Sequence, residues 1–138
     1  MSRHAIFISL IFAIALVVYA GEPRSLMDQM VVVDRGDFKD FHFRIPEDEG
    51  TEPLKIRGSF KTNGGLNDDV TFRAFTQENY VKWFSHYKHE ELVMLVKRKE
   101  GTFEFVVTPG QTYYVVLDNF FSTVSKKKIQ LKIELVSE

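Results

Sequence analysis

Cysteine is absent from the 138 residues of this chain. A disulfide framework, a thiol nucleophile and a cysteine-ligated zinc site are therefore all excluded. A charge excess is absent as well, because 18 lysines and arginines stand against 19 aspartates and glutamates, a formal net charge of −1. Nucleic-acid binding by phosphate neutralisation usually shows a clear basic excess, so we expect no nucleic-acid partner.

The chain also lacks the short motifs of common catalytic sites. It contains no GxSxG nucleophile elbow, no P-loop, no GxGxxG turn and no HExxH motif. We therefore expect that the protein is not an enzyme and that it uses no cofactor.

The chain has a single long hydrophobic run, at its N-terminus. Arg3 precedes an uncharged run of 16 residues, Ala5–Ala20, and polar sequence follows Ala20. A positive start, a short apolar core and a small last residue predict a secretory signal peptide over residues 1–20. The alternative is an uncleaved N-terminal membrane anchor, although the run is short of the roughly 20 residues of a spanning helix. We expect a periplasmic or secreted protein whose residues 21–138 form one domain.

Period-two alternation of apolar and polar residues dominates the rest of the chain, which predicts half-buried strands. The alternating segments are Phe41–Ile45, Leu54–Lys61, Val70–Ala74, Phe103–Val107, Tyr113–Leu117 and Ile129–Leu135. Met30–Val33 and Leu92–Val96 are apolar throughout, and the second suits a strand covered on both faces or a packed edge. About eight strands at steps of roughly ten residues predict an all-β antiparallel sandwich. Only Thr76–Tyr87 is predicted as helix or irregular loop.

Two stretches resemble a known family. Tyr113–Lys126 runs from a strand into Asp-Asn, an aromatic pair and a Ser- and Lys-containing turn, and Ile56–Val70 combines a glycine-containing strand, a Gly-rich turn and Asn-Asp. Both are similar to the GOLD domain, the β-sandwich of the emp24/gp25L/p24 cargo-receptor family. The matching signature positions are Asp118, Asn119, Ser122, Ser125 and Lys126. The resemblance implies a GOLD-like or jelly-roll sandwich that binds a protein or a lipid without catalysis.

The resemblance is incomplete. The receptors have a disulfide in this domain, whereas this sequence has no cysteine, and their coiled coil, membrane helix and sorting tail have no counterpart after its last predicted strand. We therefore transfer the binding module and not the trafficking role. For Asp118 and Asn119 we favour a turn-forming role, since short polar side chains bond the backbone of a following turn; a ligand contact is the alternative.

Four aromatic residues lie close together in the predicted helix or loop. Tyr80, Trp83, Phe84 and Tyr87 have spacings of three and four, which would place them on one helical face. They would either cap the open end of the sandwich or form a binding loop, because aromatic residues dominate interface hot spots. We expect the capping role; if the domain has a binding loop, this group is the best candidate for it.

Two basic triplets form a second candidate surface if they meet in the fold: Lys97, Arg98 and Lys99, and Lys126, Lys127 and Lys128. Such a patch would attract anionic lipid headgroups. We favour the other interpretation, that they are solvated strand ends, which also protect sheet edges against aggregation. Membrane contact is expected only through this patch or through the N-terminal segment.

Metal ligation is a weaker possibility. Asn63, Asn67, Asp68 and Asp69 supply only part of a calcium shell, so a solvated hairpin turn is favoured. His86 and His89 would share a face if they were helical, but a zinc site needs a third ligand. We expect no metal site.

These observations predict a non-catalytic extracytoplasmic binding module for a protein or lipid partner. The alternatives are a metal-dependent hydrolase using His86 and His89, and a structural self-associating envelope protein. The sequence leaves the oligomeric state open.

Overall fold

The computed structural model describes residues 23–48, 52–63, 68–122 and 125–137. The predicted signal peptide, residues 1–20, lies outside this part of the chain. The described residues form the elements β1 (Arg24–Val33), β2 (Phe38–Arg44), β3 (Leu54–Asn63), β4 (Val70–Thr76), α2 (Gln77–Phe84), β5 (Val93–Arg98), β6 (Glu100–Val107), β7 (Thr112–Asp118) and β8 (Lys127–Ser137). No helix within these ranges has the length and apolar character needed to cross a membrane.

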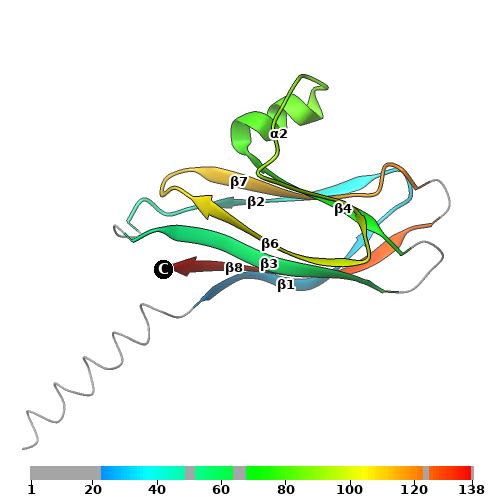
Figure 1. The fold of residues 1–138 in the computed structure, drawn as a ribbon, viewed down its shortest axis with the longest axis horizontal. Helices are drawn as coiled ribbons and strands as arrows, with labels where there is room; N and C mark the ends of the chain where they lie inside the picture. Colours follow the sequence, from blue (N-terminus) through cyan, green and yellow to red (C-terminus); the bar gives the residue numbers. More distant parts are fainter. Residues whose placement is uncertain (1–22, 49–51, 64–67, 123–124, 138) are drawn as a thin grey trace, which may run out of the picture.

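The strands form two four-stranded sheets packed face to face (Figure 1). One sheet has the order β1-β8-β3-β6 and the other β2-β7-β4-β5, with every neighbouring pair antiparallel. The pairs β1–β8, β2–β7, β3–β6 and β4–β5 are nested, as in a long hairpin rolled into two layers. This is the jelly-roll arrangement, and it confirms the predicted all-β antiparallel sandwich.

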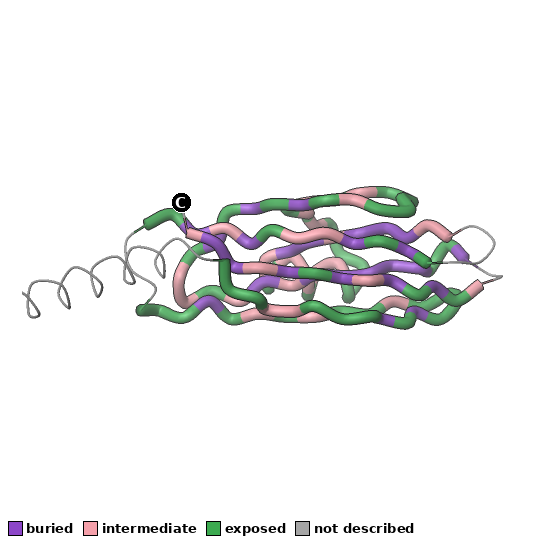
Figure 2. Tube along the Cα trace, turned by 90° about the horizontal axis from the view of Figure 1, so that it is seen from below, coloured by how far each residue is buried: buried purple, intermediate pink, exposed green. Residues whose placement is uncertain are grey.

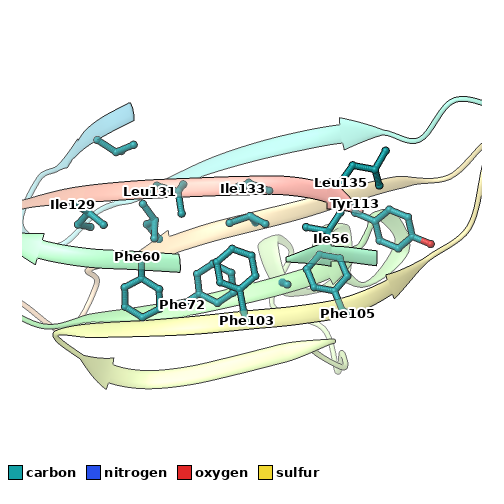
Figure 3. Close-up of a cluster of buried hydrophobic side chains, with 14 of the residues drawn as sticks. Ile56, Phe60, Phe72, Phe103, Phe105, Tyr113, Ile129, Leu131, Ile133 and Leu135 are labelled. Atoms are coloured by element: carbon teal, nitrogen blue, oxygen red, sulfur yellow. The ribbon is translucent and has the colours of Figure 1, made fainter. Parts of the chain in front are cut away.

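The core lies between the two sheets and follows the alternation in the sequence, so buried and exposed stretches alternate along the strands (Figure 2). At its centre the rings of Phe60 and Phe72 stack at 5.5 Å, and those of Phe72 and Phe103 at 4.1 Å (Figure 3). Each buried side chain of this size contributes about 1.5–3 kcal/mol of transfer free energy. The aliphatic side chains of β8 line the same core (Figure 3).

Gly58 is the one core-phase position of β3 where a side chain does not fit. A Cβ atom there would lie 2.1 Å from the Lys132 carbonyl oxygen and 2.6 Å from the Phe103 ring. The glycine therefore leaves room for Phe103 and for the close approach of β8, which explains why it interrupts an otherwise apolar series.

The structure decides two points that the sequence left open. Leu92–Val96 corresponds to β5, which is an edge strand of its sheet, and Met94 and Val96 are about half exposed. The segment Thr76–Tyr87 is helical only over Gln77–Phe84. Thr76 caps that helix by accepting a hydrogen bond from the Asn79 N–H, and His86 follows the helix with a positive φ of 62°.

A candidate aromatic binding site

Helix α2 lies across the outer face of the β2-β7-β4-β5 sheet (Figure 1). The indole of Trp83 lies 5.5 Å from the ring of Phe75, which β4 directs outward and which is fully buried. The expectation that the aromatic group caps the open end of the sandwich is therefore wrong. The helix covers a sheet face instead, because β4 and β7 carry apolar residues on both faces.

Tyr80 attaches the helix to two strands of this sheet. Its ring stacks on Tyr114 at 4.0 Å and 6°, and its hydroxyl donates a hydrogen bond to the Asp40 carboxylate on β2. Burial raises the pKa of Tyr80 above its usual value, and the hydrogen bond to Asp40 raises it further. The hydroxyl therefore remains a donor through the neutral pH range.

A cavity of about 570 Å³ opens beside the helix and is called the aromatic pocket below. It is lined by Phe38, Arg73, Trp83, Phe84, His86, Asp118 and Phe120. The ring of Phe38 lies edge-on to Trp83 at 5.2 Å and also lies 5.2 Å from Phe120. Residues from β2, β4, α2 and the end of β7 thus build one pocket with mainly aromatic walls and a few charged groups, a composition typical of ligand sites.

An ion-pair network includes two of the lining residues, Arg73 and Asp118. The Arg73 guanidinium donates from Nε to Asp118 Oδ2 at 3.0 Å and from Nη1 to Glu91 Oε1 at 2.8 Å. His89 Nε2 lies 3.0 Å from the same Glu91 oxygen. The guanidinium carbon also lies 5.8 Å from the centre of the Trp83 ring, within the range of a cation–π contact. The three ion-paired residues Arg73, Asp118 and Glu91 are called the Arg73 cluster.

The signature turn lies directly beside the pocket. Asp118 Oδ1 accepts the Phe120 N–H, while the Asn119 side chain donates to the carbonyl oxygens of Asp34 and Ser125. Ser122 Oγ donates to the Ser125 carbonyl oxygen and accepts the Ser125 N–H. These bonds position the turn, and Asp118 has in addition the ion pair with Arg73. Lys126 is exposed.

The structure separates the four residues of the predicted binding loop. Tyr80, Trp83 and Phe84 lie on α2, and Trp83 and Phe84 line the pocket. Tyr87 follows the helix and is 70% exposed, so the prediction that it shares their helical face is wrong. The helix ends before it, because the chain turns at His86 with a positive φ.

The end of α2 at Phe84 also rules out the helical arrangement expected for a histidine metal site. His86 and His89 both follow α2 and share no helical face. His86 lines the pocket, whereas His89 bonds Glu91 and the Tyr87 carbonyl oxygen. Within the described ranges, no group of three or more histidine, aspartate or glutamate residues is arranged to hold a metal ion.

The acidic pair of the predicted calcium loop is next to lysines. Asp68 Oδ1 lies 3.5 Å from Lys99 Nζ, and Asp69 Oδ1 lies 3.4 Å from Lys127 Nζ. Asn67 lies outside the described residues. A lysine ammonium beside each carboxylate offsets the charge that would attract a cation.

The two basic triplets do approach each other, at Phe121. Lys97 Nζ lies 5.0 Å and Lys127 Nζ 5.8 Å from the centre of its ring. Lys127 is only 1% exposed, however, so its predicted place in a surface patch is wrong. It is buried because it pairs with Asp69 and packs on Phe121. Arg98, Lys99, Lys126 and Lys128 are exposed, as is Lys97.

Sequence reasoning did not propose Phe38, Arg73 or Phe120 as site residues, and it did not pair Glu91 with Arg73. Phe38 carried a usable signal, because it falls in the polar phase of a strand whose core residues are Phe41 and Phe43. A contiguous apolar patch indicates a covered or binding surface, and Phe38 belongs to such a patch through its contacts with Phe84 and Phe120. Arg73 and Glu91 carried no comparable signal, since their pairing depends on which strands are neighbours.

Comparisons with known proteins give the fold and no family. No family model matches the chain, and no curated protein matches it. The chain is similar in structure to PliG of Aeromonas hydrophila, a periplasmic inhibitor of g-type lysozyme, with a TM-score of 0.53 and 10% identity over 82% of this chain and 87% of that one. It is also similar to the Yersinia pseudotuberculosis-derived mitogen, with a TM-score of 0.49 and 10% identity over 85% and 88%. The GOLD relationship stays a prediction.

Proposed function

We propose that this protein is a non-catalytic, exported binding module that recognises a protein partner through the aromatic pocket. The observation that carries the proposal is the pocket itself, in which aromatic side chains from separate elements surround one ion-paired arginine. Tryptophan, tyrosine and arginine are the residues most enriched among interface hot spots. Exported location follows from the signal peptide predicted over residues 1–20.

Two further observations support a protein partner over a lipid. The basic patch that would attract anionic headgroups has one of its lysines buried and two paired with aspartates. PliG, a sandwich of similar fold, is described as an inhibitor of a lysozyme, so it acts on another protein. A GOLD-like module would also bind a protein or a lipid, and the pocket favours the first.

Two neighbouring phenylalanines allow a matched test. Phe120 lines the pocket, whereas Phe121 packs between Lys97 and Lys127 on the other side of the same turn. The full chain is crosslinked in the cells that make it, and the captured proteins are identified by mass spectrometry. We expect one partner to be lost with Phe120→Ala and kept with Phe121→Ala. A partner retained by both variants, or no captured protein at all, would contradict the proposal.

A further inference from the structure

We infer that the aromatic pocket takes a cation, and specifically an arginine side chain presented by the partner protein. The inference rests on the proposed function and names the chemistry of the group that enters the pocket. It is carried by the charge of the Arg73 cluster and by the rings around it.

The Arg73 cluster has an excess of negative charge. Two carboxylates, Asp118 and Glu91, pair with one guanidinium, which gives a formal charge of −1 when His89, whose Nε2 lies 3.0 Å from Glu91 Oε1, is neutral. All three are less than one-fifth exposed on their side chains, so solvent screens this charge less than it screens a surface pair. Arg73 and Asp118 line the pocket, whereas Glu91 pairs with Arg73 from outside the lining and offsets its charge. The Asp118 carboxylate is then the group that favours a cationic guest over an anionic one.

The aromatic residues that line the pocket also favour a positively charged guest. The faces of aromatic rings are the negative part of their quadrupole and attract cations. The protein already uses this property, because the Arg73 guanidinium lies against the Trp83 ring at 5.8 Å. Phe38, Phe84 and Phe120 supply three more rings around the cavity.

The guanidinium of arginine fits this combination better than an ammonium. It is planar, stacks on aromatic rings and bonds carboxylates with several N–H groups, whereas an ammonium is compact and strongly hydrated. Asp118 is one of the residues that line the cavity, and each of its carboxylate oxygens accepts one hydrogen bond, from Phe120 N or from Arg73 Nε. A carboxylate has about four acceptor sites, so capacity for a guest remains. The volume of about 570 Å³ is within the usual range of ligand sites.

Trp83 makes the inference directly measurable, because it is the only tryptophan of the chain. Its fluorescence therefore reports on the pocket wall. The probes are N-acetylarginine amide and N-acetylcitrulline amide, which have nearly the same shape but differ in charge. N-acetyllysine amide, tetramethylammonium and N-acetylglutamate amide provide the ammonium, the quaternary ammonium of lipid headgroups and an anion.

We expect a saturable fluorescence change with the arginine probe and binding about two- to fivefold weaker with citrulline, the ratio of a cation–π contact at rings that are about half exposed, as Phe84 and Phe120 are. Phe120→Ala and Glu91→Gln should each weaken binding of the arginine probe, and Phe121→Ala should leave that binding unchanged. Equal binding of citrulline, tighter binding of lysine, tetramethylammonium or the glutamate probe, or no binding of arginine would overturn the inference.

Failure of this inference can be told apart from failure of the proposed function. If crosslinking still captures a partner that depends on Phe120 while the probes show no preference for arginine, only the arginine assignment is wrong. If the capture itself does not depend on Phe120, the pocket is not the binding site and both are wrong.

Discussion

The strands of both sheets alternate apolar and polar residues, but the outer faces of the two sheets differ. One carries paired charges, and the other carries a helix and aromatic side chains. On the β1-β8-β3-β6 sheet, Arg57 and Lys132 both pair with Glu134, and Lys55 pairs with Glu104. This surface is called the charged face. The outer face of the β2-β7-β4-β5 sheet instead carries α2 and the aromatic pocket.

Both faces are hollowed to a similar extent. A cavity of about 510 Å³ on the charged face is lined by residues such as Arg57, Ser59, Glu104 and Lys132. The aromatic pocket, at about 570 Å³, is lined mainly by rings. A hollow of a given size is therefore not by itself a site; the aromatic lining and the Arg73–Asp118 ion pair within it distinguish the aromatic pocket.

The largest expected difference concerns the two arginines. Arg73→Ala should lower the free energy of unfolding by about 2 kcal/mol, because it leaves the nearly buried Asp118 and Glu91 without their cation. Arg57→Ala should cost about 0.5 kcal/mol or less, since that side chain is 50% exposed and its pair is screened by water. Urea denaturation of both variants measures the difference, and equal losses would show that the two ion pairs are equivalent.

A second difference should appear at alkaline pH on the aromatic face. The raised pKa of Tyr80 means that folding favours its protonated form, so its stabilisation is complete below the unfolded pKa of about 10 and declines above it. Relative to Tyr80→Phe, the protein should be more stable by about 0.5–1 kcal/mol near pH 8, from the hydrogen bond to Asp40. Urea denaturation at pH 8 and pH 10.5 should show this advantage shrinking. A constant advantage would contradict the raised pKa.

The charged face should respond at acid pH instead. The hydrogen bond from Arg57 lowers the pKa of Glu134, so its stabilisation is present above the unfolded pKa of about 4.3 and is lost as the pH falls through the folded pKa. Compared with Glu134→Gln, we expect an advantage of a few tenths of a kcal/mol near pH 7. It should disappear once the pH falls below the lowered folded pKa, and it should shrink in 1 M salt. An advantage that survives acid would mean that Glu134 acts by packing rather than by charge.

A similarly small effect on stability is expected from two exposed apolar residues. Phe84 is 58% exposed beside the pocket and Val106 is 63% exposed on β6. Phe84→Ala and Val106→Ala should each change the free energy of unfolding by about 0.5 kcal/mol or less. Only Phe84→Ala should reduce partner capture by the full chain. A similar loss from Val106→Ala would place binding on both faces.

The sandwich was predictable from sequence, and most of the site was not. Alternation placed the strands because each one has a face in the core, and it also assigned core positions such as Phe60, Phe103 and Leu131. The aromatic group of α2 was found from its spacing. Its position over the sheet was missed, because that position depends on the pairing of β4 with β7, which are distant in sequence.

The ion pair in the pocket lining was also missed, for the same reason. Arg73 and Asp118 are 45 residues apart and meet only because their strands are neighbours. The helix boundary was missed at its C-terminal end, where the positive φ of His86 separates Tyr87 from the aromatic face. A local spacing rule carries no information about such a turn.

The most direct test of the account places a photo-crosslinking residue at position 84 or at position 106 of the full chain. The two sites have similar exposure, 58% and 63%, and lie on the outer surfaces of opposite sheets. The account predicts a specific crosslinked partner from position 84 and none from position 106. Crosslinks from position 106 alone, or equal crosslinks from both positions, would contradict it.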